Sequence, residues 1–267
     1  MPRANRHHLP GYVWHITHRC HKKEFLFKFV KDRKRWLAWL LKAKKRFGLR
    51  ILNYVVTSNH IHLLVLDHGH GEISKSMQLV AGRTAQEYNR RKKRHGAFWE
   101  DRYHATAIES GKHLIRCMIY IDLNMVRAGA VRHPCEWAFS GYQEIHNPPK
   151  RGGLLDRASL MKLCNEKEEG PLKNLLKEFM EETLAQNKME REAKWTDSVA
   201  IGDRSFVEET KEKLGIKAKG RKIIGKNGEF MIRETQQPYE ATFDPKMLHL
   251  NCENTYYWND KFIETES

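Results

Sequence analysis

The chain has 267 residues, of which 40% are hydrophobic and 30% are charged, and its net charge is +15. Seven Trp and eleven Phe argue against a disordered chain, and no run of about 18 apolar residues exists that could cross a membrane as a helix. The first eight residues lack the apolar core of a signal peptide, so we expect a protein that acts in the cytoplasm.

The positive charge is concentrated in the first part of the chain. Residues 1–150 hold 28 Lys and Arg against 11 Asp and Glu, whereas the rest hold 20 against 22. A basic region of this kind predicts a polyanionic partner, either nucleic acid or an anionic membrane surface. The five cysteines are scattered without CxxC spacing, which fits a reducing compartment and gives no zinc or disulfide framework; they are Cys20, Cys117, Cys135, Cys164 and Cys252.

The first predicted elements are a strand and a basic helix. Residues 9–18 alternate after a Pro-Gly turn and predict a strand, in which His15 could join a site but is more typical of a hydrogen-bonded structural residue. Residues 30–47 have an apolar stripe and a face of Lys and Arg, which predicts a helix that ends at Gly48.

The next stretch carries a pair of histidines. Residues 54–66 are apolar at both ends and polar in the middle, which predicts one buried strand with an interruption. Because side chains alternate along a strand, His60 and His62 share one face and Ile61 lies on the other. Two neighbouring imidazoles form half of a metal site, although a solvated polar pair is the alternative for this motif taken alone.

Two helices and a further strand follow. Residues 73–95 predict a helix that ends in the cationic run Arg90–Arg94. Residues 97–108 predict a strand with its turn, whose aromatic residues either stack on bases or belong to the core. Residues 111–129 predict a helix that stops at Gly129, and Tyr120 and Asn124 lie one turn apart on its same side.

The composition changes near residue 150. A Pro- and Gly-containing linker at 147–153 predicts a division into two parts, residues 1–147 and residues 148–267. In the second part, 157–191 and 196–214 predict amphipathic helices, and 215–240 predicts irregular structure. Aromatic residues at 256–258 are expected to dock onto the first part.

Four segments, in this order, resemble the REP-associated tyrosine transposases, a branch of the single-tyrosine HUH transposases. Each segment alone is weak evidence for the family, whereas the four segments in this order are specific to it. At one position Met125 stands where family members commonly carry Pro. The segments are Pro10-Gly11-Tyr12-Val13-Trp14-His15-Ile16-Thr17, Asn59-His60-Ile61-His62-Leu63-Leu64, Phe98-Trp99-Glu100-Asp101-Arg102-Tyr103 and Tyr120-Ile121-Asp122-Leu123-Asn124-Met125-Val126-Arg127-Ala128-Gly129.

The resemblance implies a fold, a reaction and a site. The fold would be an α+β, ferredoxin-like sandwich with a central antiparallel sheet, followed by a mainly helical C-terminal extension. His60, His62 and Asn124 would bind a divalent metal, Mg²⁺ or Mn²⁺. Tyr120 would be the catalytic nucleophile, which cleaves and rejoins single-stranded DNA near hairpins, such as a repetitive extragenic palindrome, through a 5′-phosphotyrosine intermediate.

Other expectations concern the partner and the alternatives. Arg19, Arg83 and Arg102 are the predicted phosphate contacts of a hairpin-bearing single strand, and we expect action at the nucleoid as a monomer or a homodimer. A non-catalytic protein that binds nucleic-acid hairpins and a hydrolytic metal nuclease remain alternatives. The sequence also leaves open whether the enzyme belongs to a mobile element or serves its host.

Overall fold

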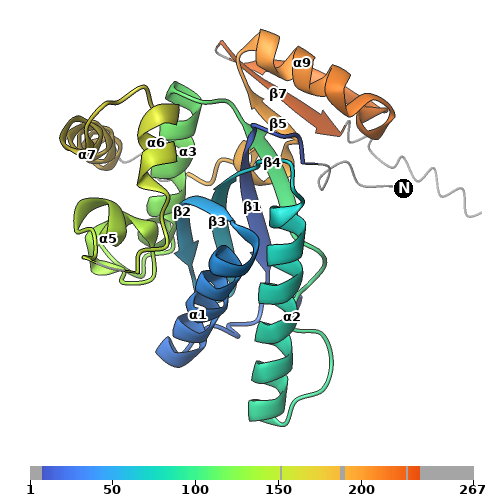
Figure 1. Cartoon of the computed structure of the whole chain (residues 1–267), viewed down its shortest axis with the longest axis vertical. Helices are drawn as coiled ribbons and strands as arrows, with labels where there is room; N and C mark the ends of the chain where they lie inside the picture. Colours follow the sequence, from blue (N-terminus) through green and yellow to red (C-terminus); the bar gives the residue numbers. More distant parts are fainter. Residues whose placement is uncertain (1–7, 151, 187–189, 227, 235–267) are drawn as a thin grey trace, which may run out of the picture. The chain divides into compact units, whose positions relative to one another are not determined.

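Six of the elements form a β-α-β-β-α-β unit, shown in the blue to green part of Figure 1. They are β1 (Val13–Arg19), α1 (Val30–Phe47), β2 (Arg50–Val56), β3 (His60–Leu66), α2 (Glu72–Lys92) and β4 (His104–Ile108). The computed structural model describes residues 8–150, 152–186, 190–226 and 228–234. In that part of the chain, no helix is both long and apolar enough to span a bilayer.

The strands of this unit have the order β2-β3-β1-β4, and every pair is antiparallel. That order and connectivity are those of a ferredoxin-like sandwich, so the predicted α+β fold class is confirmed. Helices α1 and α2 lie side by side in Figure 1, and Trp36, Leu40 and Val80 are buried from their sides. Trp14 and Ile16, on alternate positions of β1, belong to the same core cluster.

One prediction about the strands was wrong, since residues 54–66 form part of a hairpin rather than one strand. Strand β2 ends at Val56 and β3 begins at His60. Thr57 closes the turn between them, because its Oγ1 accepts the backbone N–H groups of Asn59 at 3.2 Å and of His60 at 3.0 Å. A hydroxyl that bonds nearby backbone groups in this way is a common turn device.

After β4 the chain forms several helices. They are α3 (Lys112–Asp122), α4 (Asn124–Arg127), α5 (Gly141–His146), α6 (Arg157–Leu163), α7 (Glu169–Ala185) and α8 (Lys194–Asp197), with short 3₁₀ turns at Pro134–Glu136 and, earlier in the chain, at His21–Lys23. The predicted helix over 111–129 is therefore divided at Leu123. Asn53 on β2 donates to Asp122 at the end of α3 at 3.0 Å, which ties this helix to the sheet.

The C-terminal extension continues the sheet. Strand β5 (Ala200–Gly202) pairs parallel with β4, and β7 (Glu229–Glu234) and β6 (Arg221–Lys226) follow, which gives the order β2-β3-β1-β4-β5-β7-β6. Helix α9 (Arg204–Leu214) lies beside β7 in Figure 1, and the 3₁₀ turn Gly215–Ala218 follows it. Strands from both sides of the expected boundary at residue 147 thus share one sheet.

The hairpin of β6 and β7 replaces the irregular structure that we expected over 215–240, up to residue 234. The expected docking of aromatic residues 256–258 lies outside the described residues, as does the rest of the chain beyond 234.

Candidate active site

The histidine pair lies on β3, at the floor of a cavity of about 670 Å³. Residues directly opposite each other on paired strands share a face of the sheet, and here His62 is opposite Thr17 on β1 while His60 is opposite Arg19. All four of these residues line the cavity, together with Tyr120 and Asn124 from the α3–α4 segment. The structure therefore brings the predicted metal ligands and the predicted nucleophile to one place.

A chain of hydrogen bonds fixes the protonation of His62. The backbone carbonyl of Trp195 accepts only, so the His15 Nδ1 that lies 2.9 Å from it carries the proton. Burial lowers the pKa of His15 to about 3, so its ring is neutral and Nε2 holds a lone pair. That Nε2 lies 2.8 Å from His62 Nδ1, which must be the donor. His62 consequently presents an unprotonated Nε2 to the cavity.

The neighbours of His60 also place the proton on its Nδ1, as in His62. Its Nδ1 lies 2.7 Å from the Asn59 side-chain oxygen and 3.0 Å from Thr57 Oγ1. The Thr57 hydroxyl donates to the His60 carbonyl oxygen at 2.8 Å, so both oxygens act as acceptors toward Nδ1–H. Burial, followed by the charge of Arg19, lowers the pKa of His60 to about 4, and burial lowers the pKa of His62 as well. Both rings are neutral and both direct an Nε2 lone pair outward.

Asn124 completes the donor set at the start of α4. Its amide Nδ2 lies 3.0 Å from His62 Nε2. Two neutral imidazoles and an adjacent amide are ligand types that divalent ions accept, and an amide turned about its axis offers oxygen in place of nitrogen. The residues present therefore fit a metal ion, with room in the cavity for water and phosphate oxygens.

Tyr120 stands over this floor from the last turn of α3. Its ring centroid lies 5.9 Å from that of His62 and 6.3 Å from that of His15, edge-on in both cases. The Arg127 guanidinium lies 4.2 Å from the Tyr120 ring centroid, and Arg127 also donates to the Tyr120 carbonyl at 2.6 Å. Burial raises the pKa of Tyr120, against the opposing charges of Arg127 and Arg191, so the resting side chain is a neutral phenol.

The predicted DNA-contacting arginines separate into two places. Arg19 and Arg102 line the cavity, and Arg19 pairs with Glu100 at 3.8 Å. Arg83 lies on α2, where its guanidinium is 5.7 Å from the Trp39 ring centroid and its Nη1 is 3.5 Å from the Gln86 side-chain oxygen. The structure therefore groups two of the three arginines with the histidine pair.

The C-terminal extension supplies part of the same cavity. Arg191, Thr196 and Asp197 line it, and the buried Trp195 ring lies 6.0 Å from that of Tyr120. The Ser198 carbonyl accepts hydrogen bonds from Thr106 and His104 on β4. These contacts carry no local sequence signal, because Trp195 lies 180 residues from His15 and 89 residues from Thr106 along the chain. Arg127, although it stands in the last motif, was assigned no role.

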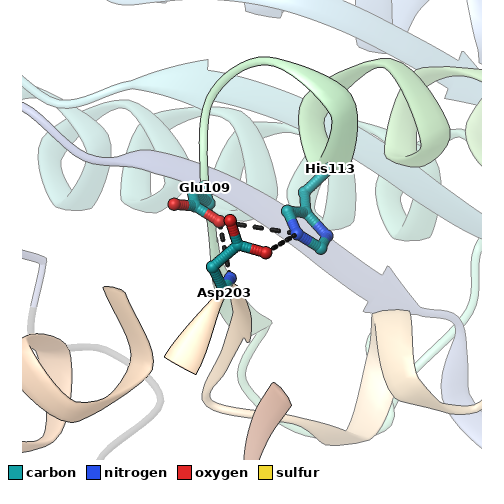
Figure 2. Close-up of side chains that lie close together, drawn as sticks. All are labelled: Glu109, His113 and Asp203. Atoms are coloured by element: carbon teal, nitrogen blue, oxygen red, sulfur yellow. Dashed lines mark hydrogen bonds and ion pairs between the residues drawn. The ribbon is translucent and has the colours of Figure 1, made fainter. Parts of the chain in front are cut away.

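A second group of ligand-type side chains lies at the junction of β4, α3 and α9. Nitrogen and oxygen atoms of Glu109, His113 and Asp203 lie within 4.8 Å of one another, as Figure 2 shows. Lys112 already contacts Asp203 at 2.9 Å, and the buried His113 faces Glu229 through its Nδ1 at 3.2 Å. Burial favours a neutral ring, yet hydrogen bonds to Glu229 and Asp203 outweigh it and raise the pKa of His113. The Nε2 of His113 also lies 3.2 Å from Asp203, so both ring nitrogens contact carboxylates and these contacts form an ion-paired clasp.

Comparison with known proteins agrees with the motifs. Residues 10–124 match the model of the family described as "Transposase IS200 like". A solved structure, of a REP-associated tyrosine transposase bound to a REP hairpin, is similar at 19% identity with a TM-score of 0.46, over 57% of this chain and 90% of that one. No curated protein matches the chain.

Proposed function

We propose that the protein is a tyrosine transposase of the REP-associated kind, because residues 10–124 match the model of the IS200-like transposase family. It would cleave and rejoin single-stranded DNA beside a hairpin. The observation that carries the proposal is the convergence of Tyr120, His60, His62 and Asn124 on one cavity that also holds Arg19 and Arg102. We expect this action to take place in the cytoplasm, at the nucleoid.

The proposed reaction is a transesterification. The Tyr120 oxygen attacks the phosphorus of the scissile phosphodiester as its phenolic proton is lost. The bond from phosphorus to the 3′ oxygen breaks, and that oxygen takes up a proton to become a 3′-hydroxyl. The DNA on the 3′ side of the cut stays attached to Tyr120 through its 5′ phosphate, as a phosphotyrosine ester. Because one ester replaces another, the reverse attack by a 3′-hydroxyl joins strands without a nucleotide cofactor.

The residues around Tyr120 act on this reaction in separate ways. A phenol whose pKa is raised by burial is a poor nucleophile, and the guanidinium of Arg127 over its ring favours the phenolate. His60, His62 and Asn124 would hold Mg²⁺ or Mn²⁺, which when bound supplies positive charge to the phosphate oxygens of the substrate. Arg19 and Arg102 are proposed to bind backbone phosphates on either side of the scissile one.

The test is a denaturing gel with hairpin oligonucleotides labelled at the 5′ or the 3′ end, incubated with Mn²⁺. We expect a shifted band that carries the 3′-labelled fragment in the unaltered protein. We expect none with EDTA, with Tyr120→Phe or with His62→Ala. Cleavage that survives Tyr120→Phe without an adduct would instead establish a hydrolytic nuclease. Binding without cleavage or adduct across a range of hairpins would establish a binding protein.

A further inference from the structure

The loop between β1 and α1 presents two phenyl rings to solvent. Phe25 is 65% exposed and Phe29 is 49% exposed, and Val30 beside them is also exposed. Among the described residues, these three are half of the large hydrophobic side chains found on the surface. Single exposed apolar residues are ordinary, whereas a cluster of them beside charged groups indicates a surface that binds something.

The rings are held on a fixed backbone. Phe27, between them, is fully buried, and its N–H donates to the Ser58 carbonyl at 2.9 Å. Arg33 Nη1 donates to the carbonyls of Phe27 at 2.7 Å and Lys28 at 3.2 Å. Leu26 and Phe27 are both buried, and Phe25 and Phe29 on either side of this pair are exposed. A partner that contacts these rings therefore meets a preformed surface.

Positive charge surrounds the rings. Residues 22–32 and 90–94 hold nine Lys and Arg against two carboxylates, Glu24 and Asp32. Lys92 lies 5.0 Å from the Phe29 ring centroid, and Arg94 pairs with Glu24 at 3.4 Å, so the end of α2 adjoins this loop. Asp32 is neutralised by Arg91. The charge that remains is positive and suits a polyanion.

Three lysines in the basic segments 22–32 and 90–94 have a strained backbone conformation. Lys22, Lys23 and Lys93 have left-handed backbone conformations with φ of 51°, 59° and 50°. In the part of the chain that the structure describes, only one other residue besides glycine does so, Asn165. Such conformations are unfavourable for residues with a side chain, and they concentrate where a structure must present particular groups.

The surface is continuous with the candidate active site. Lys23 lines the cavity, and its carbonyl accepts from the side chain of Asn59, the neighbour of His60. The loop begins directly after Arg19, which also lines the cavity. Phe25 follows the cavity-lining Lys23 by two residues, so a strand of DNA that left the cavity past Lys23 would meet this loop.

From this arrangement we infer that Phe25 and Phe29, with the cations of residues 22–31 and 90–94, bind unpaired bases of the DNA strand that enters the active site. This inference rests on the proposed function and names the path of its substrate. Aromatic side chains beside a cationic surface are how proteins bind single strands, because every base can stack and every phosphate carries charge. We call this set the Phe25–Phe29 surface.

The experiment measures fluorescence anisotropy of two labelled DNA probes in EDTA, so that binding is separated from chemistry. One probe is a hairpin with single-stranded flanks, and the other is a blunt-ended hairpin of the same stem. The variant Phe25→Ala/Phe29→Ala is compared with Phe179→Ala, a partly exposed phenylalanine on α7 that serves as the matched control. Thermal melting confirms that each variant is folded.

We expect the double variant to bind the flanked probe about 10-fold or more weakly, with little change for the blunt probe. Phe179→Ala should bind both as the unaltered protein does. If the unaltered protein binds and cleaves DNA while the double variant binds the flanked probe equally well, the inference is wrong and the proposed function stands. A double variant that changes only the self-association of the protein would make this surface a protein interface and overturn the inference. If the unaltered protein binds neither probe, both proposals fail.

Discussion

A hydrogen-bond chain runs from the Trp195 carbonyl through His15 to His62, the proposed metal ligand, and sets which nitrogen of His62 carries the proton. The Trp195 carbonyl places the proton on His15 Nδ1, and His15 Nε2 then requires a proton on His62 Nδ1. The lone pair that is left, on His62 Nε2, is the one beside Asn124. His15 acts through His62, so it is a positioning residue.

This arrangement predicts that His15 matters for metal binding. His15→Leu should weaken Mn²⁺ binding by roughly 10- to 100-fold, the usual effect of losing the partner of a metal-bound histidine. His15→Gln, which can accept from His62 and donate to a carbonyl, should recover part of that loss. Isothermal titration with Mn²⁺ measures the affinity, and ¹⁵N NMR of the imidazoles reports which His62 nitrogen carries hydrogen. Equal affinity and an unchanged His62 tautomer in His15→Leu would show that the chain has no such role.

Parts of this site follow from local spacing. The period of two along a strand puts His60 and His62 on one face, and four residues separate Tyr120 from Asn124 on adjoining helical turns. The role of His15 could not be predicted, because its partner Trp195 lies 180 residues away in the chain. Arg83 illustrates the reverse case: its place on a helix was predictable, and only the tertiary structure shows that it lies beside Trp39 and does not line the cavity.

At the scale of elements, the short segment around α8 forms one wall of the candidate active site. Trp195 is buried against Tyr120, and His104 and Thr106 on β4 bond the carbonyl of Ser198. The segment holds its place through packing of one large side chain and a few hydrogen bonds to the sheet. Its contribution to stability should therefore be concentrated in Trp195.

Replacement of that side chain tests this expectation. Trp195→Ala should lower the free energy of unfolding by about 3–5 kcal/mol, since removal of a buried Trp leaves a large cavity. Trp39→Ala is the control, because Trp39 is only partly buried and should cost less. Denaturant unfolding followed by circular dichroism gives both values. Equal losses in the two variants would mean that the α8 segment is not anchored through Trp195.

Long periodic elements were predictable, and short or polar ones were not. The amphipathic stripes of α1 and α2 identify these helices from sequence alone. The β2–β3 hairpin was missed because Thr57 and its neighbours interrupt an otherwise apolar run without a Gly or Pro signal. Strand β6 was missed because its side chains are mostly exposed and rich in Lys, so it carries no apolar pattern.

At the scale of the whole described molecule, an ion-paired clasp joins the first part of the chain to its extension. His113 on α3 and Glu109 after β4 meet Asp203 before α9 and Glu229 on β7. Lys112 and Arg116 on α3 and Lys194 on α8 add positive charge to the same carboxylates. Long-range contacts of this kind have no signature in sequence, so the division expected at residue 147 carried no sign that the two parts share a sheet.

The clasp predicts a pH dependence of stability. Because the folded-state pKa of His113 is raised above 6.5, its protonated form stabilises the fold below the unfolded pKa. That contribution is lost as the pH rises through the folded pKa. Thermal melts from pH 6 to pH 8.5 should show a larger loss of stability in the unaltered protein than in His113→Gln. Parallel pH profiles for the two proteins would show that His113 does not titrate with folding.

Peptide mapping by mass spectrometry tests most directly whether Tyr120 becomes covalently bound to DNA. The protein is incubated with a hairpin oligonucleotide and Mn²⁺, digested with trypsin and nuclease, and searched for a nucleotide-phosphate modification. We predict the modification on Tyr120, with none in Tyr120→Phe or in EDTA. A modification on Tyr103 or Tyr142, or one that persists in Tyr120→Phe, would contradict the assignment of the nucleophile.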